Sequence, residues 1–204
     1  MSSQAVLALT SDKGGVGKST LAVNLAGALR RNNTTILIDE DPIESCKTWS
    51  SRGEHLEFPV WTPESLNGSS LKSYRYVLID TEGRPKFEEV LELLRSSSLV
   101  LVPCGTSGLE IDATIKLVRR LEEAQADLTK LKVVINKAPP VGTVGQQARD
   151  ALAAQRVPVA RAVIRSYAAH QRAPEMGVLV RDVPDPRAGQ AWSDILELAM
   201  EVVR

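Results

Sequence analysis

The feature that most constrains this chain is a glycine-rich segment, S-D-K-G-G-V-G-K-S-T at residues 11–20, which follows the apolar run A-V-L-A-L and precedes an amphipathic stretch. A segment of this kind between a strand and a helix brings several backbone N–H groups onto phosphate oxygens. Gly14, Gly15 and Gly17 permit the close approach that a Cβ would obstruct. The segment predicts a phosphate cradle, against the alternative of a glycine-rich turn in which the lysines occur by chance.

Two side chains complete the predicted cradle. Lys18 supplies a cation for the β- and γ-phosphates of a nucleoside triphosphate, and Ser19 places a hydroxyl for Mg²⁺ at the start of the helix. The strict pattern G-x-x-x-x-G-K-[ST] has glycine where this chain has Asp12. The next residue, Lys13, is an additional lysine within the loop. We therefore expect a triphosphate site built on a variant loop with an extra lysine.

Composition sets the limits of the other predictions. A chain of 204 residues with 43% hydrophobic content suits one well-buried domain over residues 1–204. Twenty-five basic residues balance 25 acidic ones, so any nucleic-acid surface must be local. Cys46 and Cys104 support neither a disulfide framework nor a metal knuckle. No run approaches the roughly 18 apolar residues that span a bilayer, and residues 1–4 lack the features of a signal peptide. We expect a cytoplasmic protein.

The hydrophobic pattern predicts the fold class. Short apolar runs rich in β-branched residues alternate with stretches of helical periodicity. The predicted strands are 5–9, 35–39, 56–61, 76–80, 99–103, 132–136 and a weaker 157–159. The predicted helices are 18–31, 87–95, 111–124, 144–155 and 190–203. This alternation indicates an α/β fold, a mostly parallel twisted sheet with helices on both faces.

Carboxylates follow two of the predicted strands. Asp39 and Asp41 come at the end of I-L-I-D-E-D-P, and Asp80 ends Y-V-L-I-D. Since ligands collect beyond the carboxyl ends of parallel strands, these groups are expected at the same edge as the phosphate loop. An aspartate after a strand is also a common N-cap of the next helix. Its occurrence beside a phosphate loop favours a role in ordering Mg²⁺.

The segments K-G-G-V-G-K-S-T, D-E-D-P and the strand that ends at Asp80 together resemble the ParA/MinD family of P-loop ATPases, whose phosphate loop is a deviant Walker A motif. The resemblance implies ATP or ADP and Mg²⁺ as ligands, and slow, partner-stimulated hydrolysis. It implies that Lys13 acts across an ATP-sandwich homodimer and that Asp41 positions the attacking water. Ser19, Asp39 and Asp80 are the implied magnesium residues. The implied phosphate-binding residues are Lys13, Gly14, Gly15, Val16, Gly17, Lys18, Ser19 and Thr20.

Adenine contacts are expected from two other places. The amide of Asn136 follows the sixth predicted strand, where an ordinary turn residue is the alternative, and relatives place a loop beside the base at Pro184 and Asp185. The N-K-x-D signature of a guanine-binding site is incomplete here. A nucleotide switch at residues 81–85 is expected from its position alone.

The distribution of charge along the chain indicates what such an ATPase could bind. Residues 151–174 contain no Asp or Glu but hold Arg156, Arg161, Arg165, His170 and Arg172. By resemblance to partition ATPases, Arg165 and Arg172 are the expected contacts to nonspecific duplex DNA, against the alternative of a solvated arginine-rich face.

The leading interpretation is therefore a nucleoid-associated ATPase for plasmid or chromosome partition, stimulated by a ParB-like or other small adaptor. The alternatives are an ATPase that positions a protein cargo such as a carboxysome, and a metabolic or metal-insertion ATPase. The final helix has three acidic side chains against one arginine, so membrane attachment is not expected.

Overall fold

The computed structural model describes residues 4–53, 56–66 and 71–203. Within these residues, seven parallel strands form one sheet of order β3-β2-β4-β1-β5-β6-β7. The strands are β1 (Ala5–Leu9), β2 (Thr35–Asp39), β3 (Val60–Trp61), β4 (Tyr76–Asp80), β5 (Leu99–Cys104), β6 (Leu131–Ala138) and β7 (Val159–Arg165). The helices are α1 (Lys18–Arg30), α2 (Ser45–Ser51), α3 (Phe87–Ser96), α4 (Gly108–Glu123), α5 (Val144–Ala154), α6 (Ala168–Met176) and α7 (Ala188–Val202).

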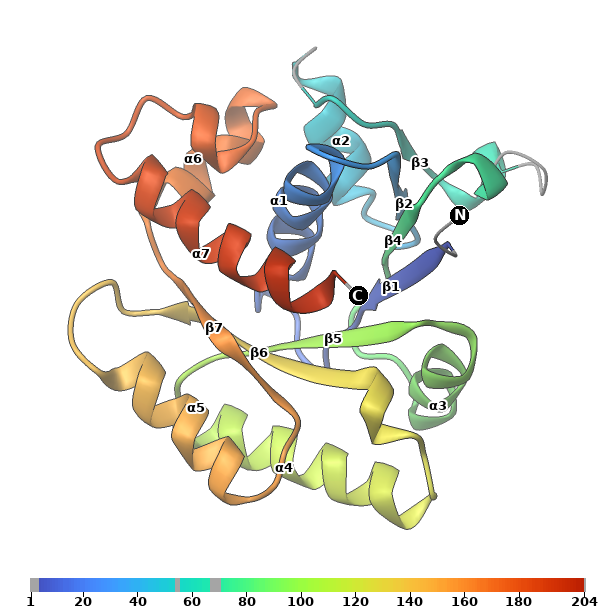
Figure 1. Cartoon of the computed structure of the whole chain (residues 1–204), viewed down its shortest axis with the longest axis vertical. Helices are drawn as coiled ribbons and strands as arrows, with labels where there is room; N and C mark the ends of the chain where they lie inside the picture. The colour runs from blue at the N-terminus through green and yellow to red at the C-terminus, as the bar shows by residue number, and fades with distance from the viewer. Residues whose placement is uncertain (1–3, 54–55, 67–70, 204) are drawn as a thin grey trace.

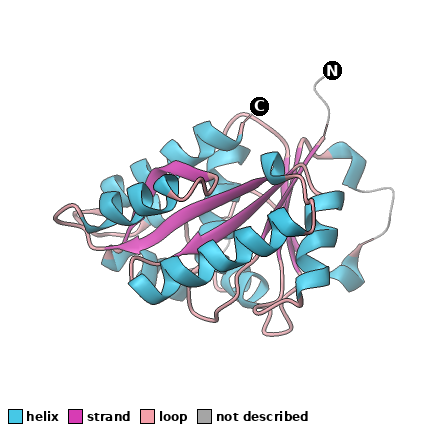
Figure 2. Ribbon diagram, turned by 90° about the horizontal axis from the view of Figure 1, so that it is seen from below, coloured by secondary structure: helices cyan, strands magenta, loops and turns pink. Residues whose placement is uncertain are grey.

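Helices cover both faces of the sheet (Figures 1 and 2). On one face α1, α2, α6 and α7 bury an apolar core against the sheet, and on the other α3, α4 and α5 bury a second core. This arrangement confirms the α/β fold class and the mostly parallel sheet. No helix among the described residues has the length and apolar character needed to cross a bilayer.

The strand order decides where a ligand can bind. From β1 the chain moves outward to β2, and after β4 it crosses to β5 on the other side of β1. The carboxyl end of β1 is thus a topological switch point, the usual ligand position in open parallel sheets. The phosphate-loop segment begins at this end of β1.

Several element boundaries differ from those expected. The third strand covers only Val60–Trp61 of the predicted 56–61, and the seventh is Val159–Arg165, where the sequence predicted 157–159. In β7 the buried residues are Ala160, Ala162 and Ile164, two of them small, and arginine and valine separate them, so the apolar signal is weak. Helices α2 and α6 were not among the predicted helical ranges. Residues 1–3 and Arg204, which entered the signal-peptide and membrane arguments, lie outside the described residues.

Helix α4 starts at Gly108, three residues before its predicted start. Ser107 and Glu110 form a capping box there, in which the Ser107 side chain accepts from the backbone N–H of Glu110. A capping box stabilises a first turn that has little apolar periodicity of its own. The helix therefore extends beyond the periodic part of its sequence.

Candidate functional site

The phosphate loop connects β1 to α1, as the sequence predicts. Gly15 and Gly17 have positive φ angles of 76° and 86°, a conformation that residues with a Cβ rarely adopt. Gly17 is the N-cap of α1, and the first turn of this helix contains no acidic residue and receives no side-chain cap. Its N–H groups and the positive end of the helix dipole therefore remain available to an anion.

A cavity of about 600 Å³ lies over this loop. Its lining includes the loop itself with Lys13, Ser19 and Thr20, the turn after β2 with Asp41, and the turn after β4 with Gly83 and Arg84. Its volume suits a nucleotide-sized ligand. The expected switch segment thus borders the same cavity as the phosphate loop.

Lys18 brings the predicted catalytic residues together. Its ammonium donates to Asp80 Oδ1 at 2.8 Å and to the Thr81 carbonyl, and it lies 3.6 Å from Asp41 Oδ2. Lys18 is 7% exposed and Asp80 is fully buried. Removing one member of such a buried pair leaves an uncompensated charge, which lowers the stability of the fold.

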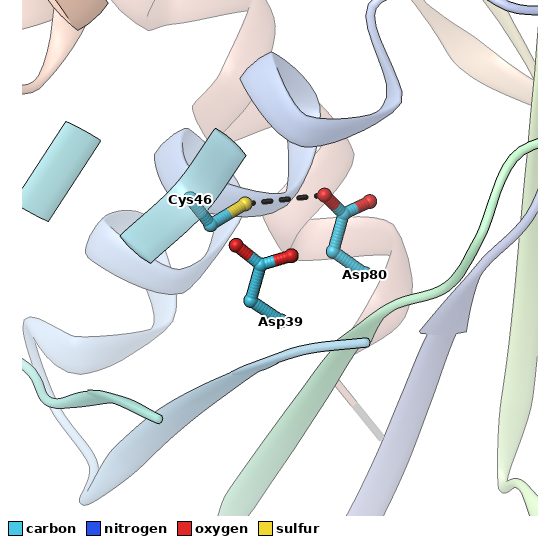
Figure 3. A group of neighbouring side chains, drawn as sticks. All are labelled: Asp39, Cys46 and Asp80. Carbon is cyan, nitrogen blue, oxygen red and sulfur yellow. Dashed lines mark hydrogen bonds between the residues drawn. The ribbon is translucent and has the colours of Figure 1, made fainter. Parts of the chain in front are cut away.

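Strand register places the two strand-end aspartates side by side. Asp39 of β2 pairs in register with Asp80 of β4, and the α2 residue Cys46 lies against both (Figure 3). The Cys46 thiol donates to Asp80 Oδ2 at 3.1 Å, and the ligand atoms of the three side chains lie within 4.8 Å of one another. Burial raises the pKa of the Cys46 thiol well above its ordinary value, so the sulfur stays protonated.

Besides facing Asp80, the Asp39 carboxylate accepts two hydrogen bonds from the backbone. Its Oδ2 accepts from the backbone N–H of Lys47 at 2.9 Å and its Oδ1 from that of Asp41 at 3.3 Å. Burial raises the pKa of its carboxyl group. Asp39 thus anchors the first turn of α2 and the turn that carries Asp41, while Asp80 faces Lys18.

The donor set fits Mg²⁺. Magnesium prefers oxygen ligands and is usually held by one or two carboxylates together with substrate phosphates and water. Asp80, Asp39 and the hydroxyl of Ser19 supply oxygen donors beside the phosphate loop, and the protonated thiol of Cys46 does not compete with them.

A second cavity of about 370 Å³ adjoins the first through Gly17, Thr20, Lys137 and Pro174, which line both. Its walls combine apolar residues of α1, β7 and α7 with polar side chains that include Asn136, Arg165, His170 and Gln171. A pocket with apolar walls and polar groups next to a phosphate loop can accept a base. Asn136 lines this pocket, and its contact with adenine stays a prediction.

The predicted base loop lies elsewhere. Neither Pro184 nor Asp185 lines either cavity. The carbonyl of Pro184 accepts from Arg172 Nη1 at 3.0 Å, and Asp185 lies 4.0 Å from the same guanidinium. The base-sized cavity is closed instead by residues 164–167 and by α6.

The two arginines expected to bind DNA differ in their environments. Arg165 ends β7 and is bound to the buried Asp194 of α7, through Nη2 at 2.5 Å and through Nε at 3.0 Å. Arg172 on α6 is exposed, and its side chain contacts Pro184 and Asp185 among the described residues. Arg156 and Arg161 are also exposed. The acid-free stretch is thus partly neutralised by α7.

Sequence reasoning missed three residues of this region. The sequence gives Cys46 no place in the site, places His170 only in the acid-free stretch, and does not distinguish Lys137 from other lysines. Both ring nitrogens of His170 are buried without a hydrogen-bond partner among the described residues, and burial lowers the pKa of the imidazole. The positive φ of Lys137 is not visible in the sequence.

Comparisons with known proteins agree with this geometry. The model of the CobQ/CobB/MinD/ParA nucleotide binding domain matches residues 7–180. Maintenance of carboxysome distribution protein A of Gloeobacter kilaueensis is 29% identical, over 98% of this chain and 94% of its own length. The protein of the same name from Halothiobacillus neapolitanus is 25% identical, over 97% and 95%. The crystal structure of a putative plasmid partition protein of Borrelia burgdorferi bound to AMPPNP has a TM-score of 0.69 at 17% identity, covering 98% of this chain and 100% of that one.

Proposed function

This chain belongs to the CobQ/CobB/MinD/ParA nucleotide-binding family, and we propose that it is an ATPase that positions a protein cargo through ATP-dependent binding to nonspecific DNA. The observation that carries the proposal is the similarity over nearly the full length to two carboxysome distribution proteins. Cargo positioning was the alternative interpretation of the sequence. The leading interpretation, plasmid or chromosome partition, has less support, because the partition protein is similar at the level of fold alone.

In the proposed reaction, the phosphates of ATP occupy the larger cavity and the base occupies the smaller one. The triphosphate competes with Asp80 for the Lys18 ammonium, now 2.8 Å from Asp80 Oδ1. Release from Lys18 leaves the Asp80 carboxylate available for Mg²⁺, which when bound neutralises phosphate charge. Nucleotide and metal binding are thus coupled through one ion pair.

Asp41 is proposed to position the attacking water. Its Oδ1 is held by the backbone N–H of Ile43 at 3.0 Å, and its Oδ2 lies 3.6 Å from Lys18. Phosphoryl transfer depends on positioning and charge neutralisation, which a fixed carboxylate, two lysines and the loop N–H groups supply. Hydrolysis by this set is proposed to be slow and stimulated by an adaptor protein.

Lys13 is proposed to act on the nucleotide of a second copy. It is exposed at the rim of the phosphate cavity, just before the glycines of the loop. An exposed cation in this place adds to the attraction between two subunits when a triphosphate lies in each. ATP would then promote dimerisation. The dimer would offer twice as many DNA contacts as a single monomer.

Deletion of the gene in its native cell tests the cargo. We expect large protein assemblies to lose their regular spacing, as scored by electron tomography, and plasmid retention to stay normal. A chromosomal copy with Lys13→Gln serves as the matched control, because Lys13 is exposed and its loss should reproduce the deletion without unfolding the protein. Normal assembly spacing together with plasmid loss would replace the proposal by partition. Normal behaviour of both would favour a metabolic or metal-insertion ATPase.

A further inference from the structure

Strand β6 contains a bulge where it passes the phosphate loop. Ile135 pairs with Val163 and Ala138 pairs with Arg165, so three steps along β6 correspond to two steps along β7. The extra residue lies at Asn136 and Lys137, and Lys137 has a left-handed φ of 56°. Bulges of this kind re-aim side chains and are frequent next to active sites.

The bulge sends two consecutive side chains to the same loop. In a regular strand neighbouring side chains point to opposite faces of the sheet. Here Asn136 Nδ2 donates to the Val16 carbonyl at 2.7 Å and Lys137 Nζ donates to the Gly15 carbonyl at 2.5 Å. The fit is close, since a Cβ on Gly17 would lie 2.7 Å from Asn136 Nδ2 and 3.2 Å from Lys137 Cε.

These two hydrogen bonds fix groups that bind phosphate. The C=O and N–H of one trans peptide point in opposite directions within a rigid plane. Holding the Gly15 carbonyl therefore orients the Val16 N–H, and holding the Val16 carbonyl orients the Gly17 N–H. Both N–H groups belong to the loop that is to cradle the phosphates.

The positive φ of Lys137 is not explained by the end of a helix, as it is at other residues. Gln125 and Arg156 also have positive φ, but each follows the C-terminal end of a helix, where the left-handed conformation is common. Among the described residues, Lys137 is the one non-glycine residue with this conformation inside a strand. Strain of this kind persists where the surrounding structure enforces it, and it is concentrated at functional sites.

We propose that Asn136 and Lys137 form a clamp, here called the β6 clamp, that holds the phosphate loop in its phosphate-binding shape at a cost in folding stability, with Lys137 as a positioning residue. The proposal rests on the proposed nucleotide binding and adds a specific role for a lysine outside the loop. It distinguishes the β6 clamp from a contact that only stabilises the fold, because it requires ATP affinity to fall in Lys137→Gly without a fall in stability.

The test compares Lys137→Gly and Lys137→Met with the parent in Mg-ATP affinity by calorimetry and in Tm without nucleotide. Glycine accepts the left-handed backbone, so Lys137→Gly should keep or raise the Tm and still weaken ATP binding about tenfold, as expected for loss of a charge-assisted hydrogen bond. Lys137→Met keeps the side-chain stem and should lose affinity equally. The matched control is Gln125→Gly, which relieves the same conformation after α4 and should leave ATP affinity unchanged.

Parent affinity in both Lys137 variants would overturn the β6 clamp and leave the proposed function intact. A lower Tm with a matching loss of affinity in Lys137→Gly would also overturn it, because the contact would then be structural. A parent protein that does not bind ATP would overturn the proposed function and the β6 clamp together.

Discussion

Replacing Arg165 with alanine should destabilise the protein, which bears directly on how the DNA surface can be tested. Asp194 is 2% exposed and accepts hydrogen bonds from three donor groups of Arg165: the backbone N–H at 3.0 Å, and the Nε and Nη2 groups of the guanidinium. The variant keeps the first donor and loses the other two. The buried Asp194 carboxylate then accepts only the backbone N–H of residue 165 from this position and loses the paired positive charge.

The magnitude follows from burial. Loss of one partner from a fully buried ion pair costs about 3–5 kcal/mol. The Arg165 side chain is 37% exposed, so solvent screens part of the interaction and we expect a loss of about 2 kcal/mol. With a urea m-value of about 2 kcal/mol/M, the unfolding midpoint should fall by about 1 M.

Urea unfolding followed by tryptophan fluorescence measures this shift, with Arg172→Ala as the matched control. Arg172 is 45% exposed and lies 4.0 Å from Asp185, so its loss should move the midpoint by less than about 0.3 M. Equal midpoints for the parent and Arg165→Ala would refute the argument. A double replacement of Arg165 and Arg172 would otherwise confuse loss of DNA contacts with loss of fold, so Arg172 is the better single test of the DNA surface.

Three further predictions concern the nucleotide site. Asp41→Ala should bind Mg-ATP and dimerise but release no phosphate above background in a colorimetric assay, and parent-like turnover would contradict the role of Asp41 in positioning water. Lys13→Gln should keep monomer ATP affinity and lose ATP-dependent dimerisation in light scattering, and an equal dimer fraction would remove its action on a second copy. Burial lowers the pKa of His170 below its ordinary value, so the unfolded chain takes up the proton first and stability is lost as the pH falls through this range. The urea midpoint should therefore drop between about pH 7.5 and about pH 5.5, less so in His170→Gln, and an equal drop in both proteins would contradict this.

The fold and the phosphate loop were predictable because local patterns determine them. Strands β1, β2 and β4 have the predicted boundaries, since each is a continuous apolar run that ends in a polar turn. The adjacency of Asp39 and Asp80 followed from the rule that parallel strands end at one edge. Their register makes that adjacency direct.

Other parts of the site depend on contacts that a linear pattern does not contain. The Cys46 thiol reaches Asp80 only because α2, a helix of seven residues with little periodicity, folds over the strand ends. Asn24 of α1 accepts from the backbone N–H of Val180, which is 156 residues away in the sequence, and donates to the Thr20 carbonyl. The β6 bulge arises from the pairing of β6 with β7, and the residue types Asn136 and Lys137 do not by themselves predict a bulge.

The central claim is an ATP-dependent switch in DNA binding, and one measurement tests it most directly. Fluorescence anisotropy of a labelled random-sequence duplex is followed against protein concentration with Mg-ATP and with Mg-ADP, over a series of salt concentrations. We expect binding with ATP that weakens steeply as salt rises, and little binding with ADP, because the proposed ATP dimer would present twice the phosphate contacts of the monomer. Equal binding with the two nucleotides, or none with ATP at the lowest salt, would contradict it.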